Sequence, residues 1–152
     1  MNRRALALAT LILLAPLAAR ADGEPMLDGA VTTPLALTAP LLAGLPSTAI
    51  DIAFETAKGR ESGHYQGVLL WTLIEKAGLA PLPGKNGDIR RTLVITGRDG
   101  YQAALALGEI DPHYEGKAAL IAPEGADGLH LLVPGDRHGG RSVRDVVRIE
   151  VH

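Results

Sequence analysis

The sequence predicts a single compact α+β domain that is mainly β, and three observations support this fold class. Short runs of alternating apolar and polar residues recur along the chain, which is the spacing of half-buried strands. Turn formers separate these runs, since the chain holds 18 glycines and 10 prolines. Only one segment, roughly residues 68–77, has clear helical spacing. Many short strands with one clear helix indicate a domain dominated by β structure.

The N-terminus predicts a secretory signal peptide over residues 1–21. Arg3 and Arg4 form a basic start, Ala5–Leu17 is an almost unbroken apolar run, and Ala19–Ala21 fits the small-x-small cleavage pattern. As a helix, the apolar run would span about 20 Å, which is short of the ~30 Å hydrocarbon core of a bilayer. We therefore expect a periplasmic protein with no membrane span after signal removal.

Composition excludes some classes of partner. Without residues 1–21, the chain carries 12 Lys and Arg against 17 Asp and Glu, a net charge of −5. An acidic chain without a basic helix or an aromatic platform is not expected to bind nucleic acid. The remaining length suits one domain, and with Cys 0 the stability must come from the core and not from disulfides.

The first half of the chain is expected to contain short strands and long connections. Pro34 restricts its strand to a sheet edge, and Ile50, Ile52 and Phe54 share one face of an alternating strand. We expect, in order, a flexible leader at 22–30 that precedes the domain at 31–152, an edge strand at 31–37, a turn at 41–46, a strand at 49–54 and a polar, glycine-containing loop at 55–67.

The helix and the strands of the second half follow from stronger local patterns. Leu70, Leu73, Ile74 and Ala77 have helical spacing, and Gly78 is a typical residue after a helix end, which predicts the helix over 68–77. Further strands are expected at 92–96 and 101–107 around an Asp-Gly hairpin turn, at 117–122 and 129–133 around a second Asp-Gly turn, and at 147–151.

The segment Gly135–Ser142 contains the best candidate for a binding site. It reads G-x-x-x-x-G-R-S, close to a Walker A loop, but a true P-loop needs a following helix and the pattern here enters a strand. Its adjacent glycines would let backbone amides approach an anion, and Arg141 could bind that anion with two parallel hydrogen bonds. Two interpretations stay open: an anion cradle, or a tight turn whose arginines pair with Asp136 and Asp145.

Metal and hydrolytic sites are not predicted, and no catalytic residue is assigned. His113, His130 and His138 lie 17 and 8 residues apart, without an H-x-H or H-E-x-x-H pair. The chain has no G-x-S-x-G nucleophile elbow. Glu109 and Asp111 could act as acid and base, but this spacing is more typical of residues that cap a turn or a helix start.

Five motifs follow one another along the chain: Tyr65–Leu79, Thr96–Tyr101, Leu107–Pro112, Ala119–Ala122, and Leu132–Asp136 together with Arg141–Val151. Their order resembles the molybdopterin-binding domain of the sulfite oxidase superfamily, and most of all its short, exported, molybdopterin-dependent oxidoreductase-like members. The resemblance covers about residues 27–152 and implies a mainly β α+β fold with a molybdopterin cofactor.

The resemblance also implies which residues bind the cofactor and where this chain departs from the family. In the family, basic residues of the C-terminal motif bind the phosphate of the pterin. By resemblance, the residues expected to bind it in this chain are His138, Arg141, Ser142 and Arg144. Family enzymes place a metal-binding cysteine after the strand that corresponds to 50–54, and this chain has none. Because a soft thiolate matches a metal held by sulfur ligands, the sequence does not favour bound molybdenum.

Two functional hypotheses follow. The first is an exported molybdopterin-binding protein, an oxidoreductase of the sulfite oxidase type that lacks the metal-ligating cysteine. The second is a cofactor-free periplasmic module. It would bind a small anionic ligand at Arg141 and Arg144, or a redox or sensor partner protein through Trp71 or the edge strand near Val31.

Overall fold

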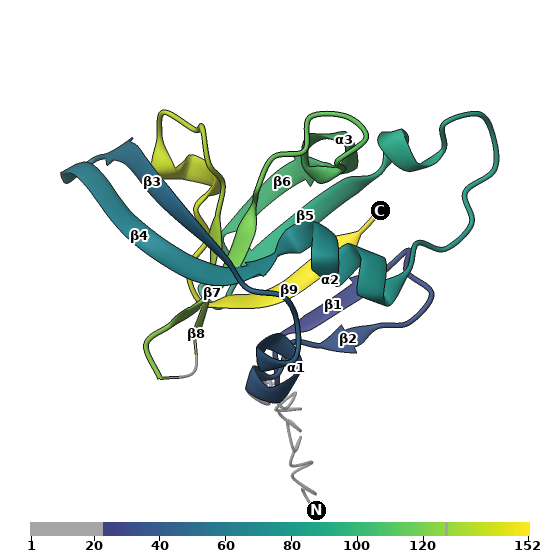
Figure 1. Cartoon of the computed structure of the whole chain (residues 1–152), viewed down its shortest axis with the longest axis horizontal. Coiled ribbons are helices and arrows are strands. Elements are labelled where there is room, and N and C mark those ends of the chain that lie inside the picture. The colour runs from purple at the N-terminus through teal and green to yellow at the C-terminus, as the bar shows by residue number, and fades with distance from the viewer. Residues whose placement is uncertain (1–22, 127) are drawn as a thin grey trace, which may run out of the picture.

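A computed structural model describes residues 23–126 and 128–152 of the chain. Two β-sheets pack around a common core, and short helices lie at the ends of the strands (Figure 1). The predicted mainly β α+β fold class is confirmed. The predicted signal peptide at 1–21 lies outside the described residues. Within the described ranges, no helix combines the length and apolar character that a membrane crossing requires.

The five-stranded sheet has the order β2-β1-β9-β5-β6. The Asp-Gly turn predicted between β5 and β6 is confirmed, and so is the last strand. The expected leader differs from the structure from Met26 onward, because β1 pairs in parallel with β9 and Leu27 is fully buried. The strands are β1 (Met26–Gly29), β2 (Leu35–Ala36), β5 (Thr92–Gly97), β6 (Gln102–Ala106) and β9 (Val146–Val151).

The four-stranded sheet has the order β3-β4-β7-β8, and its β3–β4 hairpin projects from the body of the molecule (Figure 1). The loop expected over 55–67 is wrong, since nine residue pairs join β3 to β4. The apolar face of β3 supplies the packing, so the polar residues of β4 can form a strand without an alternating pattern of their own. The strands are β3 (Thr48–Thr56), β4 (Gly59–Leu69), β7 (Leu120–Glu124) and β8 (Gly128–Leu132).

Three short helices and two 3₁₀ turns complete the fold. The predicted helix is confirmed as α2 (Leu70–Ala77), whose stripe of apolar side chains is buried and which ends at Gly78 with φ 67°. The expected turn at 41–46 is wrong for residues 41–43, which belong to the short helix α1 (Ala39–Ala43). The helix forms because the Thr38 hydroxyl accepts a hydrogen bond from the Leu41 amide and caps its start. The others are α3 (Leu107–Ile110), η1 (Asp88–Arg90) and η2 (Gly139–Arg141).

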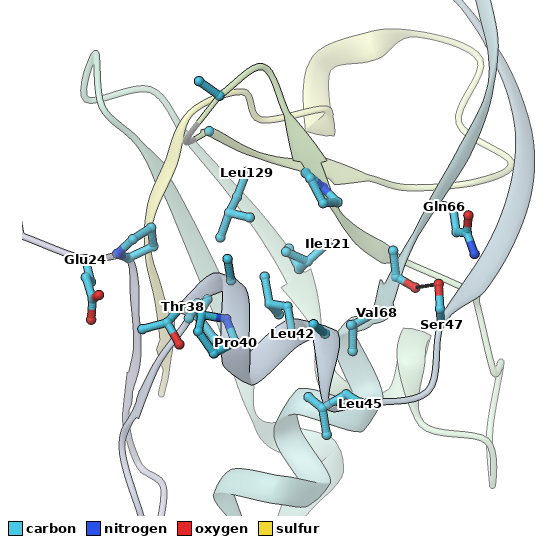
Figure 2. Close-up of a pocket in the computed structure, with 18 of the residues that line it drawn as sticks. Glu24, Thr38, Pro40, Leu42, Leu45, Ser47, Gln66, Val68, Ile121 and Leu129 are labelled. Carbon is cyan, nitrogen blue, oxygen red and sulfur yellow. Dashed lines mark hydrogen bonds between the residues drawn. The ribbon is translucent and has the colours of Figure 1, made fainter.

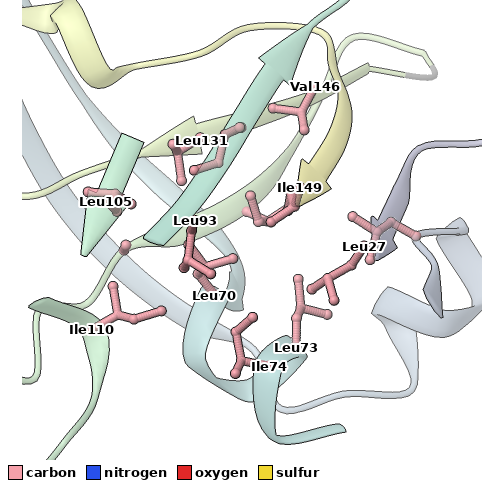
Figure 3. Packing of buried hydrophobic residues seen from close by; sticks show 14 of the residues in the cluster. Leu27, Leu70, Leu73, Ile74, Leu93, Leu105, Ile110, Leu131, Val146 and Ile149 are labelled. Atoms are coloured by element: carbon pink, nitrogen blue, oxygen red, sulfur yellow. The ribbon is translucent and has the colours of Figure 1, made fainter. Parts of the chain in front are cut away.

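The core consists of two clusters on either side of β7 and β8. The larger cluster lies between the five-stranded sheet and α2, where Leu27, Leu73 and Ile149 are fully buried (Figure 3). The smaller cluster joins Ile52 and Phe54 of β3 to apolar residues of β7 and β8. The η2 turn lies against this second cluster, because a Cβ on Gly139 would be 2.8 Å from the Phe54 ring.

Arg91 is a charged residue that is buried with the core. Arg91 is only 2% exposed and follows η1. Its guanidinium donates hydrogen bonds to the backbone carbonyls of Ala30 and Ala80, and its Nε lies 3.1 Å from a carboxylate oxygen of Asp88. The side chain therefore ties the irregular 80–90 segment to the chain after β1.

Candidate functional site

The connection between β8 and β9 positions Arg141, the central residue of the predicted anion cradle. Its Nη2 lies 2.6 Å from Asp136 Oδ1 and its Nε 2.9 Å from Asp136 Oδ2, a bidentate pair. Its Nη1 lies 2.8 Å from Glu109 Oε2. The hydrogen bonds that Arg141 donates to Asp136 and Glu109 raise its pKa further above its ordinary value, despite partial burial. The guanidinium therefore donates hydrogen bonds to a carboxylate on each of two sides.

Glu109 is the second anchor of Arg141. It accepts a hydrogen bond from the Ala106 amide at 3.1 Å, so it caps the start of α3 as expected, and its other oxygen lies 3.2 Å from Lys117 Nζ. Burial raises the pKa of Glu109, but the hydrogen bonds from Arg141, Ala106 and Lys117 together lower it below its ordinary value. The carboxylate is therefore charged and already satisfied.

Arg144 forms a separate charge cluster. Its Nη1 contacts a carboxylate oxygen of Glu124 at the end of β7, and its Nη2 lies 3.5 Å from Glu61 Oε2 on β4. The sequence interpretation in which the arginines pair with Asp136 and Asp145 is met at Asp136, which pairs with Arg141. For Arg144, the structure places Glu61 and Glu124 at the guanidinium in place of Asp145.

Ser142 is joined to a histidine that the sequence did not single out. Ser142 Oγ lies 2.6 Å from Nε2 of His130, which is 1% exposed, and the Tyr65 ring packs edge-on against the imidazole at 6.0 Å between centroids. Burial lowers the pKa of His130, although the charge of Glu61 opposes this. The signal that could have revealed it is a single polar residue inside the apolar run of β8.

The Ser142–His130 pair does not form a nucleophilic triad. The nearest carboxylate to Nδ1 is Glu124, whose Oε1 is 3.8 Å away, beyond the ~2.6–3.2 Å reach of a hydrogen bond that would orient a catalytic base. The imidazole is also enclosed by the smaller core cluster. Ser142 therefore provides the hydrogen-bond partner of the buried Nε2 of His130, and its role is structural.

Replacing Ser142 with alanine should lower the free energy of unfolding by about 1–3 kcal/mol, because the buried Nε2 of His130 loses its partner. Urea unfolding at about pH 8 measures the change with His130 neutral in both states. Ser62→Ala on exposed β4 is the matched control and should stay within about 0.5 kcal/mol of the wild type. Equal stability of the two variants would contradict the role assigned to Ser142.

Stability should also fall as the pH drops from about 7 to about 5. The unfolded imidazole of His130 takes up a proton near pH 6.5, whereas burial holds the folded-state pKa below that value. The contribution of neutral, buried His130 to the free energy of unfolding is complete above the unfolded-state pKa. It is lost as the pH falls from the unfolded-state pKa to the folded-state pKa. Urea unfolding at several pH values between about 5 and 7 measures how the free energy of unfolding changes with pH. This change should be smaller for His130→Gln than for the wild type, and an identical change would assign the pH dependence to other groups.

His138 lies at the edge of the β3–β4 hairpin. Its backbone forms an isolated parallel bridge with Glu55, and the Glu55 amide donates to the Arg137 carbonyl at 2.9 Å. Its side chain is exposed to solvent. The backbone of this residue therefore joins the β8–β9 connection to the end of β3.

These residues do not fit a molybdopterin site. The chain has no cysteine to hold the metal, and each arginine assigned to the phosphate already contacts two carboxylates. A phosphate would have to displace a carboxylate or lie beside its negative charge. Within the described residues, no cluster of three or more His, Cys, Asp or Glu side chains could hold a metal ion.

The surfaces expected to dock a partner are largely covered. Trp71 is half-buried and packs against the larger core cluster. Val31 is 9% exposed and pairs with Leu79 in an isolated antiparallel bridge. Neither position presents an open apolar surface to a second protein.

A cavity of about 1020 Å³, here called the α1 cavity, lies between α1 and the four-stranded sheet (Figure 2). Its apolar lining comes from Leu42 of α1, Val68 of β4, Ile121 of β7 and Leu129 of β8. None of the four predicted binding residues lines it. No sequence pattern predicts this site, because its lining comes from separate segments and forms no motif.

Comparison with known proteins identifies the fold alone. Neither a family model nor a curated protein sequence matches the chain. The structure is similar to the crystal structure of the sulfane dehydrogenase SoxCD from Paracoccus pantotrophus, with a TM-score of 0.69 and 20% sequence identity. The match covers 86% of this chain and 38% of that chain, so this protein spans well under half of its length. The likeness confirms the predicted mainly β α+β fold class.

Proposed function

We propose that this protein is a cofactor-free binding module on a sulfite oxidase-like scaffold, which acts in the periplasm after export. The observation that carries the proposal is the pairing of Arg141 and Arg144 with two carboxylates each. A guanidinium that grips a phosphate must offer its N–H groups to that ligand. In this chain those groups are already bound, and no thiolate is present to hold a metal.

The local charge supports the same proposal. A dianionic phosphate would enter a region with excess negative charge, and desolvation would strengthen the repulsion. The excess holds in each of the two charge clusters. Around Arg141, two cations (Arg141 and Lys117) meet three carboxylates (Glu109, Glu115 and Asp136), and Arg144 alone meets Glu61 and Glu124.

The test is the cofactor content of protein purified after export from cells that make molybdenum enzymes. We expect elemental analysis to find no molybdenum above the buffer, and oxidised extracts to show no pterin fluorescence. A molybdenum enzyme purified from the same cells is the positive control for cofactor supply. Stoichiometric pterin in the wild-type protein would overturn the proposal.

A second candidate, a molybdopterin-dependent oxidoreductase, is favoured by one observation. The match to SoxCD, a sulfane dehydrogenase, covers 86% of this chain. This candidate predicts that cofactor-loaded protein reduces an artificial electron acceptor when a reduced sulfur compound is added. The first proposal predicts no such reduction by the protein as purified.

A further inference from the structure

We propose that the α1 cavity binds an uncharged, largely apolar small molecule. This inference rests on the proposed function and names the ligand class for it. The cavity volume of about 1020 Å³ is at the upper end of the roughly 300–1,000 Å³ of small-molecule sites. Such sites are mostly apolar and carry a few polar groups that orient the ligand, and the α1 cavity has this composition.

The floor of the cavity is apolar. Leu42, Val68, Ile121 and Leu129 line it, and none is more than 9% exposed. Within α1, Leu42 is buried and Leu41 also packs against the larger core cluster, so two leucines hold the helix over the cavity. Small residues border the remaining space, among them Ala39, Ala43 and Gly128. Water reaches the more exposed apolar lining, such as Pro40, Ala43 and Leu45, and an apolar ligand would replace that water.

The charges around the cavity select against an ionic ligand. Glu24 and Arg98 are the charged lining residues, one of each sign, and both are exposed. The floor holds no charge, so an ionised group carried down to the floor, away from Glu24 and Arg98, would lose hydration without gaining a partner there. An uncharged ligand avoids this cost.

Hydroxyl and amide groups stand at opposite ends of the cavity (Figure 2). Thr38 Oγ1 accepts a hydrogen bond from the Leu41 amide at 3.2 Å, so its own O–H can donate to a ligand. At the other end, Ser47 Oγ donates to the Gly67 carbonyl at 3.4 Å and keeps lone pairs for a ligand donor, beside the exposed carboxamide of Gln66. The ligand we infer has an apolar body with a hydrogen-bonding group at one or both ends.

Two fluorescent probes with the same aromatic body test the inference. N-phenyl-1-naphthylamine is neutral, and 1-anilinonaphthalene-8-sulfonate adds one negative charge. With protein purified after export, the neutral probe should show saturable one-to-one binding with increased fluorescence. The sulfonate should bind roughly tenfold more weakly, because its charge finds no partner at the floor.

A substitution that fills the cavity assigns the binding to this site. Ala43→Trp on α1 should weaken binding of the neutral probe by roughly tenfold or more, while Ala104→Trp on the exposed face of β6 should change it less than about twofold. Circular dichroism and thermal melting establish that each variant is folded. Gln66→Trp, which enters from β4, is the second blocking variant if Ala43→Trp does not fold.

Two results would overturn the inference: neutral-probe binding that neither blocking variant weakens, or sulfonate binding as tight as that of the neutral probe. Failure of the proposed function is distinguishable. Molybdenum and pterin in the same preparation would contradict that function whatever the probes do. If the protein contains no cofactor and does not bind the neutral probe, only the ligand class proposed for the α1 cavity is contradicted.

Discussion

Replacing Arg91 with alanine should lower the free energy of unfolding by about 3–5 kcal/mol. The variant leaves a cavity in a site that is 2% exposed, and it removes the hydrogen-bond donors of the Ala30 and Ala80 carbonyls. An unsatisfied buried carbonyl costs about 1–3 kcal/mol, and the lost packing adds to this. The partner carboxylate of Asp88 is largely exposed and contributes little, because water replaces the arginine.

The adjacent arginine is the matched control for this experiment. Arg90 is exposed and donates to the Pro83 carbonyl at 2.7 Å. Arg90→Ala should therefore change stability by about 0.5 kcal/mol or less. Urea unfolding of both variants compares the same chemical change at two neighbouring positions. If Arg91→Ala is as stable as Arg90→Ala, the buried guanidinium does not hold the 80–90 segment in place.

Replacing Gly67 with alanine should cost about 3 kcal/mol, the upper range of overpacking substitutions. A Cβ at Gly67 would lie 2.2 Å from the Ile121 carbonyl oxygen and 2.8 Å from the Ala122 Cα. Both atoms belong to the backbone of β7, so relief requires β4 and β7 to separate next to the point where they pair. Thermal melting and urea unfolding measure the loss.

Gly108→Ala is the control for the effect of an added methyl group. A Cβ there meets no atom within 4 Å, and the residue lies in α3. Stability should stay unchanged or rise by up to about 1 kcal/mol, because alanine favours a helix over glycine. Similar stability of Gly67→Ala and Gly108→Ala would mean that the β4–β7 joint tolerates a larger spacing than the structure indicates.

Local sequence patterns predicted the elements whose stability is local. The stripe of Leu70, Leu73 and Ile74 with Gly78 behind it predicted α2, and the Asp-Gly turn predicted the β5–β6 hairpin. The predictions that failed concern segments without such patterns. The polar strand β4 exists because β3 packs beside it, and β1 exists because β9 offers it an edge at the far end of the chain.

For the candidate binding residues, the sequence predicts some properties and the tertiary structure decides the others. By itself, the sequence determined the fold class, the acidic composition, the lack of a thiol and the presence of two arginines near a pair of glycines. It could not determine which carboxylates meet those arginines, because Glu109 is 32 residues from Arg141 and Glu61 is 83 residues from Arg144. Only the folded chain brings these charges within a few ångströms, where Coulomb attraction is strong enough to bind the guanidinium groups. The α1 cavity likewise exists only after α1 packs beside β4, β7 and β8, since no local pattern encodes the space between elements.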